Sequence, residues 1–254
     1  MVYVWVGLAL LCSLPASALF GDWLGRRKSA RYDLSEKPER ERSYVVPNAL
    51  LALTGLLIGF TFAMAQRHYD SREQIVLAEA SHIKTTYDRT QLLDDARGEE
   101  LRALLRRYVD ARLAFEHTGW DRARMDAEET RSEAIGDEIW SRVAAAARDD
   151  MHSVMLAQLV QSTNQMLDAA DEHLAALENP LPPTVFVVLG LVTAVALAAV
   201  GFASSADRRR NWLALLVMPL LLAVVTMLVF DISYPRLGVV HVHDPILVRL
   251  KQTF

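Results

Sequence analysis

The sequence predicts an all-α membrane protein with four transmembrane helices and a helical extramembrane domain between the second and the third. Three observations lead to this fold class. Apolar residues, 52% of the 254, are gathered in blocks, charges are gathered in others, and the long charged middle segment contains almost no Gly or Pro. A hydrocarbon core about 30 Å thick needs roughly 20 helical residues to cross it. Four stretches meet that length without a charge: 2–20, 44–65, 184–204 and 212–230.

The first stretch has a second interpretation as a signal peptide, because SLPASA at 13–18 offers small residues for cleavage. However, its leading residues MVYVWV carry no Lys or Arg, and its apolar run is longer than a signal peptide needs. A retained helix is therefore favoured. The single cysteine, Cys12, lies inside this stretch, so neither a disulfide framework nor a cysteine metal site is expected.

Charge in the short loops predicts the orientation. Residues 21–43, between the first two stretches, carry seven basic and five acidic side chains, and three consecutive arginines at 208–210 separate the last two stretches. Short loops rich in Arg and Lys stay in the cytoplasm. The helical domain is therefore expected on the extracytoplasmic side, together with both ends of the chain.

The middle segment, 67–180, is predicted to be helical because Gly and Pro are scarce and apolar residues recur at helical spacing. Its first helix continues out of the second span, and three more are expected at 95–117, which Gly119 ends, at 121–147 and at 151–177. The segment holds 14 basic and 23 acidic side chains, a net charge of −9. Such a surface argues against nucleic acid as a partner.

The end of the chain is predicted to be extended. RLGVVHVHDPILVRL at 236–250 alternates apolar and polar residues around β-branched positions, which is typical of a short strand or an extended tail. The expected organisation is therefore 1–66 for two transmembrane helices and their basic loop, 67–180 for the acidic helical domain, 181–231 for the last two transmembrane helices, and 232–254 for the tail.

The sequence offers little for catalysis, so we expect no enzyme and no cofactor. It lacks a phosphate-binding Gly-rich loop, G-x-S-x-G and H-E-x-x-H. The best metal-like pattern, His241-x-His243 with Asp244, has too few ligands to specify a site, so no metal is expected. His173, beside Asp171 and Glu172, is interpreted as part of a solvated face.

The second span contains the best candidate for a functional site. Gly55 and Gly59 form a G-x-x-x-G, a spacing that lets helices approach closely in lipid. The polar side chains favour the face of Thr54, Ile58 and Thr61 as the one that avoids lipid. None of the four predicted stretches contains a charge, so a pore along this helix would select by size, dewetting and aromatic edges.

The sequence resembles the bestrophin-like proteins, a mostly bacterial and plant family related to the bestrophin anion channels. Four segments carry the resemblance: GFTFAMAQRHYDSR (59–72), EASHIKTTYDRTQLL (79–93), LRALLRRYVDARLAF (101–115) and DISYPRLGVVHVHDPIL (231–247). The resemblance implies a multi-pass protein of the bacterial plasma membrane that permits chloride or other small anions to cross, assembled as a homo-oligomer with five copies by analogy.

In bestrophins the second helix lines the pore and its apolar neck ends in a Gly-Phe pair, which here corresponds to Gly59 and Phe60. Ala52 and Leu56 then share the face of Phe60, and Arg67 lies near the mouth. This face differs from that of Thr54, Ile58 and Thr61, so two pore faces are proposed. Bestrophins also bind calcium through acidic residues after the last span, whereas this chain has only isolated Asp231 and Asp244 there. Calcium gating by that route is not expected.

Two alternatives stay open at this point. The first concerns function, because the chain is also consistent with a non-conducting membrane protein whose helical domain binds a partner or senses the state of the cell envelope. The second concerns orientation, because bestrophins keep their helical segment in the cytosol, opposite to the side that the arginine loops indicate.

The loop charges lead to a first testable prediction. Alkaline phosphatase, which is active only outside the cytoplasm, should be active when fused after Phe254 and inactive when fused after Lys28, in the basic loop. The opposite pair of activities would contradict the orientation and support the bestrophin arrangement.

Overall fold

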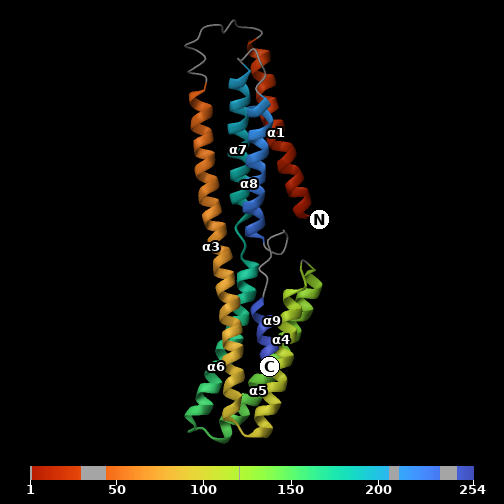
Figure 1. Ribbon diagram of the computed structural model, residues 1–254, viewed down its shortest axis with the longest axis vertical. Helices are drawn as coiled ribbons and strands as arrows, with labels where there is room; N and C mark the ends of the chain where they lie inside the picture. The colour runs from red at the N-terminus through yellow and green to blue at the C-terminus, as the bar shows by residue number, and fades with distance from the viewer. Residues whose placement is uncertain (1, 30–43, 120, 206–211, 235–244) are drawn as a thin grey trace. The chain divides into compact units, whose positions relative to one another are not determined.

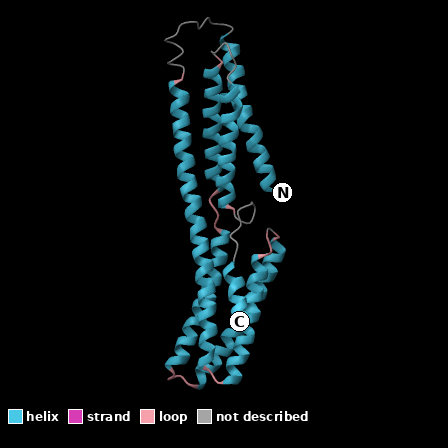
Figure 2. Cartoon of the chain, viewed as in Figure 1, coloured by secondary structure: helices cyan, strands magenta, loops and turns pink. Residues whose placement is uncertain are grey.

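The computed structural model of the protein describes residues 2–29, 44–119, 121–205, 212–234 and 245–254, and every regular element in them is a helix (Figures 1 and 2). These residues belong to two compact units. Unit 1 comprises Met1–Tyr69 with Leu181–Val240, and unit 2 comprises Asp70–Pro180 with His241–Phe254. Helix α3, Val45–Arg89, contributes residues to both. The predicted all-helical class is confirmed for the described part of the chain.

Unit 1 contains the apolar helices. They are α1 (Val2–Ser29), the first part of α3, α7 (Pro183–Ser204) and α8 (Met218–Ser233). Among the described residues, four helical segments are long and apolar enough to cross a membrane, which confirms the four predicted spans. A π-helical turn, Leu213–Val217, precedes α8. Pro219 accounts for it, because a proline ring clashes with the carbonyl four residues earlier and widens the helix there.

Helix α1 is longer than the apolar stretch that predicted it, and its last turns include one acidic residue, Asp22, and three basic ones, Arg26, Arg27 and Lys28. The Asp22 side chain is buried, and both of its carboxylate oxygens accept hydrogen bonds from Nε of Arg26, at 3.0 and 3.1 Å. A buried carboxylate is tolerated when a charged partner satisfies it. The pairing explains how the helix continues past the end of the apolar run.

Glycines bring α1 and α7 into close contact. A Cβ atom added to Gly21 would lie 1.9 Å from the carbonyl oxygen of Ala198, and one added to Gly201 would lie 1.9 Å from that of Ala18. Leu14 and Leu197 bury their side chains beside this crossing. In lipid, where hydrophobic attraction between helices is absent, such backbone contact is a main source of association.

Unit 2 is built from the remainder of α3, a 3₁₀ turn at Thr90–Leu92, and helices α4 (Asp95–Glu116), α5 (Arg122–Asp149) and α6 (Val154–Glu178). The last three lie within three residues of their predicted ranges. Asp94, Asp121 and Ser153 cap them, each accepting a hydrogen bond from a backbone N–H in the first turn. Gly119 follows α4 with a φ of 58°, a left-handed conformation that favours glycine.

The core of unit 2 is a single apolar cluster that draws on every helix of the unit. Each helix contributes residues that recur at helical spacing, and the largest of them exclude solvent almost completely. The central members are Ile83, Leu105, Tyr108, Ile139, Leu159, Met166 and Leu247.

The prediction of an extended C-terminal tail is wrong where the structure describes it, because Pro245–Thr253 forms helix α9. Leu247 and Leu250 pack into the core of unit 2, where α9 contacts α4. β-branched residues favour strands only weakly, and burial of an amphipathic face overrides that preference. Residues 235–244, which include His241, His243 and Asp244, lie outside the described residues.

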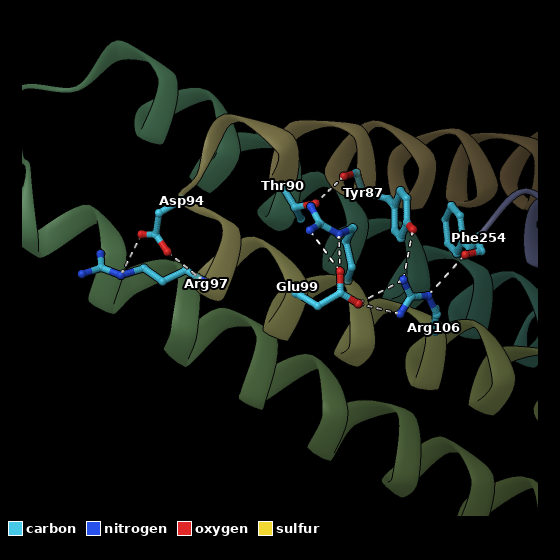
Figure 3. A network of polar contacts seen from close by, with 8 residues as sticks. Tyr87, Thr90, Asp94, Arg97, Glu99, Arg106 and Phe254 are labelled. Atoms are coloured by element: carbon cyan, nitrogen blue, oxygen red, sulfur yellow. Dashed lines mark hydrogen bonds and ion pairs between the residues drawn. The ribbon is translucent and has the colours of Figure 1, made fainter.

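An aromatic stack and an arginine hold Phe254, which follows α9, in place (Figure 3). The rings of Tyr87 and Phe254 are parallel, with centroids 3.9 Å apart. Arg106 donates from Nε to the carbonyl oxygen of Phe254, at 3.3 Å, and also pairs with Glu99. Residues 70–180 therefore receive part of their core from a segment that follows the last apolar helix.

The glycine contact generates a second prediction. Gly201→Ala should destabilise unit 1 by about 1–3 kcal/mol, because the new Cβ meets backbone atoms that cannot move aside. Gly190→Ala is the matched control on the same helix, since no atom lies within 4 Å of its Cβ position. Thermal unfolding of the purified protein in detergent measures both, and equal melting temperatures for the two variants would contradict the close packing.

Candidate functional site

The unit 1 part of α3 has one covered face and one open face. The covered face carries Thr54, Ile58 and Thr61, with exposed fractions of 0, 8 and 6%. Both threonine hydroxyls donate to the backbone carbonyl four residues earlier, those of Leu50 and Leu57. Hydrogen bonding within the helix thus satisfies the polar groups that made this face a pore candidate.

Residues of α7 lie beside the covered face. Thr61 and Leu57 line a crevice of about 280 Å³ together with residues from the first two turns of α7: Thr184, Val185, Val188 and Leu189. The crevice is apolar apart from the two threonines. The subunit's own helix therefore occupies the side of α3 that the sequence polarity favoured.

The open face carries the residues that the family resemblance selected. Leu56 and Phe60 are 54 and 61% exposed, and Ala52, Gly59 and Arg67 are also exposed. No atom lies within 4 Å of a Cβ placed on Gly55 or Gly59, so no described helix of this chain uses the G-x-x-x-G. The open face is consequently available to lipid, to water or to another copy of the chain.

A buried charged network lies on the unit 2 part of α3. Glu79 and Arg112 are almost completely buried, and the arginine donates to both carboxylate oxygens, from Nε at 2.5 Å and from Nη2 at 3.2 Å. Nδ1 of His173 lies 2.7 Å from Oε2 of Glu79, and Nε2 lies 3.3 Å from Oε1 of Glu116. The network joins α3, α4 and α6. We therefore correct the interpretation of His173, which is buried with these partners rather than solvated beside Asp171 and Glu172.

The network keeps both members of the central pair charged. Burial opposes ionisation of Glu79, but the hydrogen bond with His173 and the charge of Arg112 outweigh it and hold the pKa of the carboxyl below its ordinary value of 4.5. Burial likewise opposes the charge of Arg112, but Glu79 raises the pKa of the guanidinium above its ordinary value. The ring of Phe115 lies against the guanidinium, with its centroid 5.0 Å from Cζ.

Sequence reasoning missed Glu79 and Arg112, although both lie in segments that carry the family resemblance. The available signal was a charged residue inside an apolar stripe. Glu79 falls between Val76 and Ile83, and Arg112 lies one turn after Tyr108, all of them buried. One stripe interrupted by an acid and another interrupted by a base indicate a buried ion pair, since neither charge is stable alone in a core.

The described residues contain no group of three or more His, Cys, Asp or Glu side chains that is arranged to hold a metal ion. The network instead has the chemistry of a structural pairing, because its arginine, histidine and carboxylates satisfy one another. Helix α3 carries both the predicted pore residues, at 52–67, and one member of the network, Glu79.

Four helices apolar enough to cross a bilayer define a multi-pass membrane protein. The model of the bestrophin-like domain family matches residues 12–245, so the chain belongs to the bestrophin-like family. Its fold is similar to that in the crystal structure of a mutated bacterial bestrophin homolog from Klebsiella pneumoniae, with a TM-score of 0.66 over 95% of this chain and 96% of that chain. The two sequences are 8% identical. No curated protein matches.

The charged network generates a third prediction. Because the pKa of Glu79 is lowered by folding, its contribution to stability is complete above pH 4.5 and is lost as the pH falls through the lower folded value. Glu79→Gln should cost about 3–5 kcal/mol by leaving Arg112 buried without its counter-ion. Amide hydrogen exchange in α4 should therefore accelerate by about 100-fold or more at neutral pH.

The matched control is Glu100→Gln, which removes an exposed carboxylate paired with Arg142 at 3.0 Å. An exposed pair contributes at most about 1 kcal/mol, so exchange in α4 should change little. Equal acceleration in the two variants would mean that the buried pair does not hold unit 2 together. The acid-induced loss of protection should also be smaller in Glu79→Gln than in the unaltered protein.

Proposed function

We propose that the protein is a homo-oligomeric anion channel whose central pathway is lined by the open face of α3. Membership of the bestrophin-like family and the bestrophin fold support a channel. The choice of the face that lines the pathway rests on the difference between the two faces of α3. Thr54, Ile58 and Thr61 are covered by the same chain, whereas Leu56 and Phe60 are open.

Assembly is part of the proposal, because one subunit has too few apolar helices to enclose a pathway. Repetition of one surface around a closed ring is the usual way for identical subunits to build one. The open glycines, Gly55 and Gly59, leave space for a neighbouring helix or for the pathway itself. Five copies, as in bestrophins, are the expected number.

The chemistry of the open face is consistent with small anions such as chloride. Leu56 and Phe60 form an apolar constriction, and the edge of a phenylalanine ring is mildly positive, so it attracts anions without binding them tightly. Arg67 adds a full positive charge two turns further along the same helix. The alternative function is that of a non-conducting protein whose acidic helical unit binds a partner or senses the envelope. It requires neither an apolar constriction nor a positive charge on the open face.

The channel proposal generates a fourth prediction. Phe60→Ala should increase chloride conductance severalfold in planar bilayers containing the purified protein, because it removes the ring from the narrowest part of the pathway. Phe62→Ala is the matched control: its ring is also exposed, at 39%, but points to a different side of α3. Electrically silent protein, or equal effects of the two substitutions, would overturn the proposed lining and favour the non-conducting alternative.

A further inference from the structure

A cavity of about 320 Å³ opens within unit 2 between α4, α5 and α6. Tyr108 and Arg112 of α4 form part of its wall. Four carboxylates also line it: Glu129, Glu133 and Asp137 of α5, and Asp171 of α6. A cavity of this size admits a small organic molecule, and its lining carries more negative than positive charge.

Tyr108 contributes a polar group to the wall of this cavity. The residue is 2% exposed, and its hydroxyl makes no hydrogen bond to any residue that the structure describes. Burial raises the pKa of Tyr108, so the hydroxyl stays neutral. A hydroxyl at the wall of a cavity, with no protein partner among the described residues, is available for a hydrogen bond with a ligand. The phenol can accept a hydrogen bond from an ammonium group, and its ring face attracts cations.

The four carboxylates lack the basic partners that neighbouring acids possess. On the same helix, Glu128 pairs with Arg131 and Glu138 pairs with Arg107. Within the described residues, none of the four cavity carboxylates forms an ion pair with Arg, Lys or His. Burial, followed by the charge of Glu133, raises the pKa of Glu129. This crowding of like charges is relieved when a cation enters.

The positive charge of Arg112 does not oppose a cation strongly. Its Nε and Nη2 atoms donate to the carboxylate of Glu79. The charge of Arg112 lowers the pKa of Glu129, but burial and the neighbouring carboxylates outweigh it. The cavity lining therefore keeps an excess of negative charge.

The spacing of the carboxylates favours a linear cation over a metal ion. Glu129, Glu133 and Asp137 follow one another at intervals of four residues, which places them on one side of α5 about 6 Å apart along its axis. A metal ion needs ligands that converge on one point, and the described residues offer no such group. A linear cation with amines separated by three- or four-carbon chains repeats its charge over a comparable length.

We propose that this cavity binds a linear polyamine, with successive ammonium groups beside Glu129, Glu133 and Asp137, and with Tyr108 accepting a hydrogen bond from one of them. Asp171 approaches the chain from α6. The site is separate from the proposed pore face of α3, and its occupancy is measured by binding rather than by conductance.

Isothermal titration calorimetry of the full-length protein in detergent, with spermidine as the probe at about 0.15 M ionic strength to screen diffuse attraction, tests the proposal. Binding should saturate at one molecule per chain. Glu133→Gln should weaken it about tenfold or more, the loss of one charge-assisted contact, and Tyr108→Phe should weaken it severalfold while keeping the core filled.

The matched control is Glu138→Gln, which removes the same charge from the same helix outside the cavity and should change the affinity less than about twofold. The proposal is overturned by three results: heat that does not saturate, unaltered affinity in Glu133→Gln, or equal losses in Glu133→Gln and Glu138→Gln. Complete displacement of spermidine by an equal concentration of magnesium chloride also overturns it, since this would indicate simple charge screening. Circular dichroism confirms that each variant retains its helices.

Discussion

The buried pair of Glu79 and Arg112 is the interaction on which the arrangement of unit 2 depends. A charge in a core is stable only beside its partner, so α3 and α4 must meet in the one register that joins these side chains. His173 adds α6 to the same register through both ring nitrogens. The pair also sets the wall of the acidic cavity, because Arg112 and Tyr108 occupy the same side of α4 one turn apart.

Unit 1 relies on a different constraint, which is that glycines, having no side chain, stand where two helices cross. Gly21 and Gly201 bring two backbones into contact, whereas Gly55 and Gly59 face open space. The same residue type therefore serves packing within the subunit at one place and leaves a surface free at another. Sequence alone does not distinguish these uses, since a G-x-x-x-G specifies only that another helix can approach.

Elements with a strong local signal were predictable, and pairings between distant residues were not. The four apolar spans and the end of α4 before Gly119 follow from composition and backbone preference. Helix α9 was missed because its side chains alternate like those of a strand, and only its contact with α4 decides otherwise. The open face of α3 was proposed from the family resemblance, while the local polarity of Thr54 and Thr61 favoured the face that the chain itself covers.

Helix α9 has a consequence for the order of events during synthesis. Leu247 and Leu250 complete a core whose other members lie at 80–167, yet the ribosome makes α7 and α8 before it makes α9. Domains generally begin to fold as they emerge, at rates faster than translation. The core of unit 2 therefore stays incomplete until α9 is made, after the last two apolar helices. Closure of this core therefore follows the synthesis of α7 and α8.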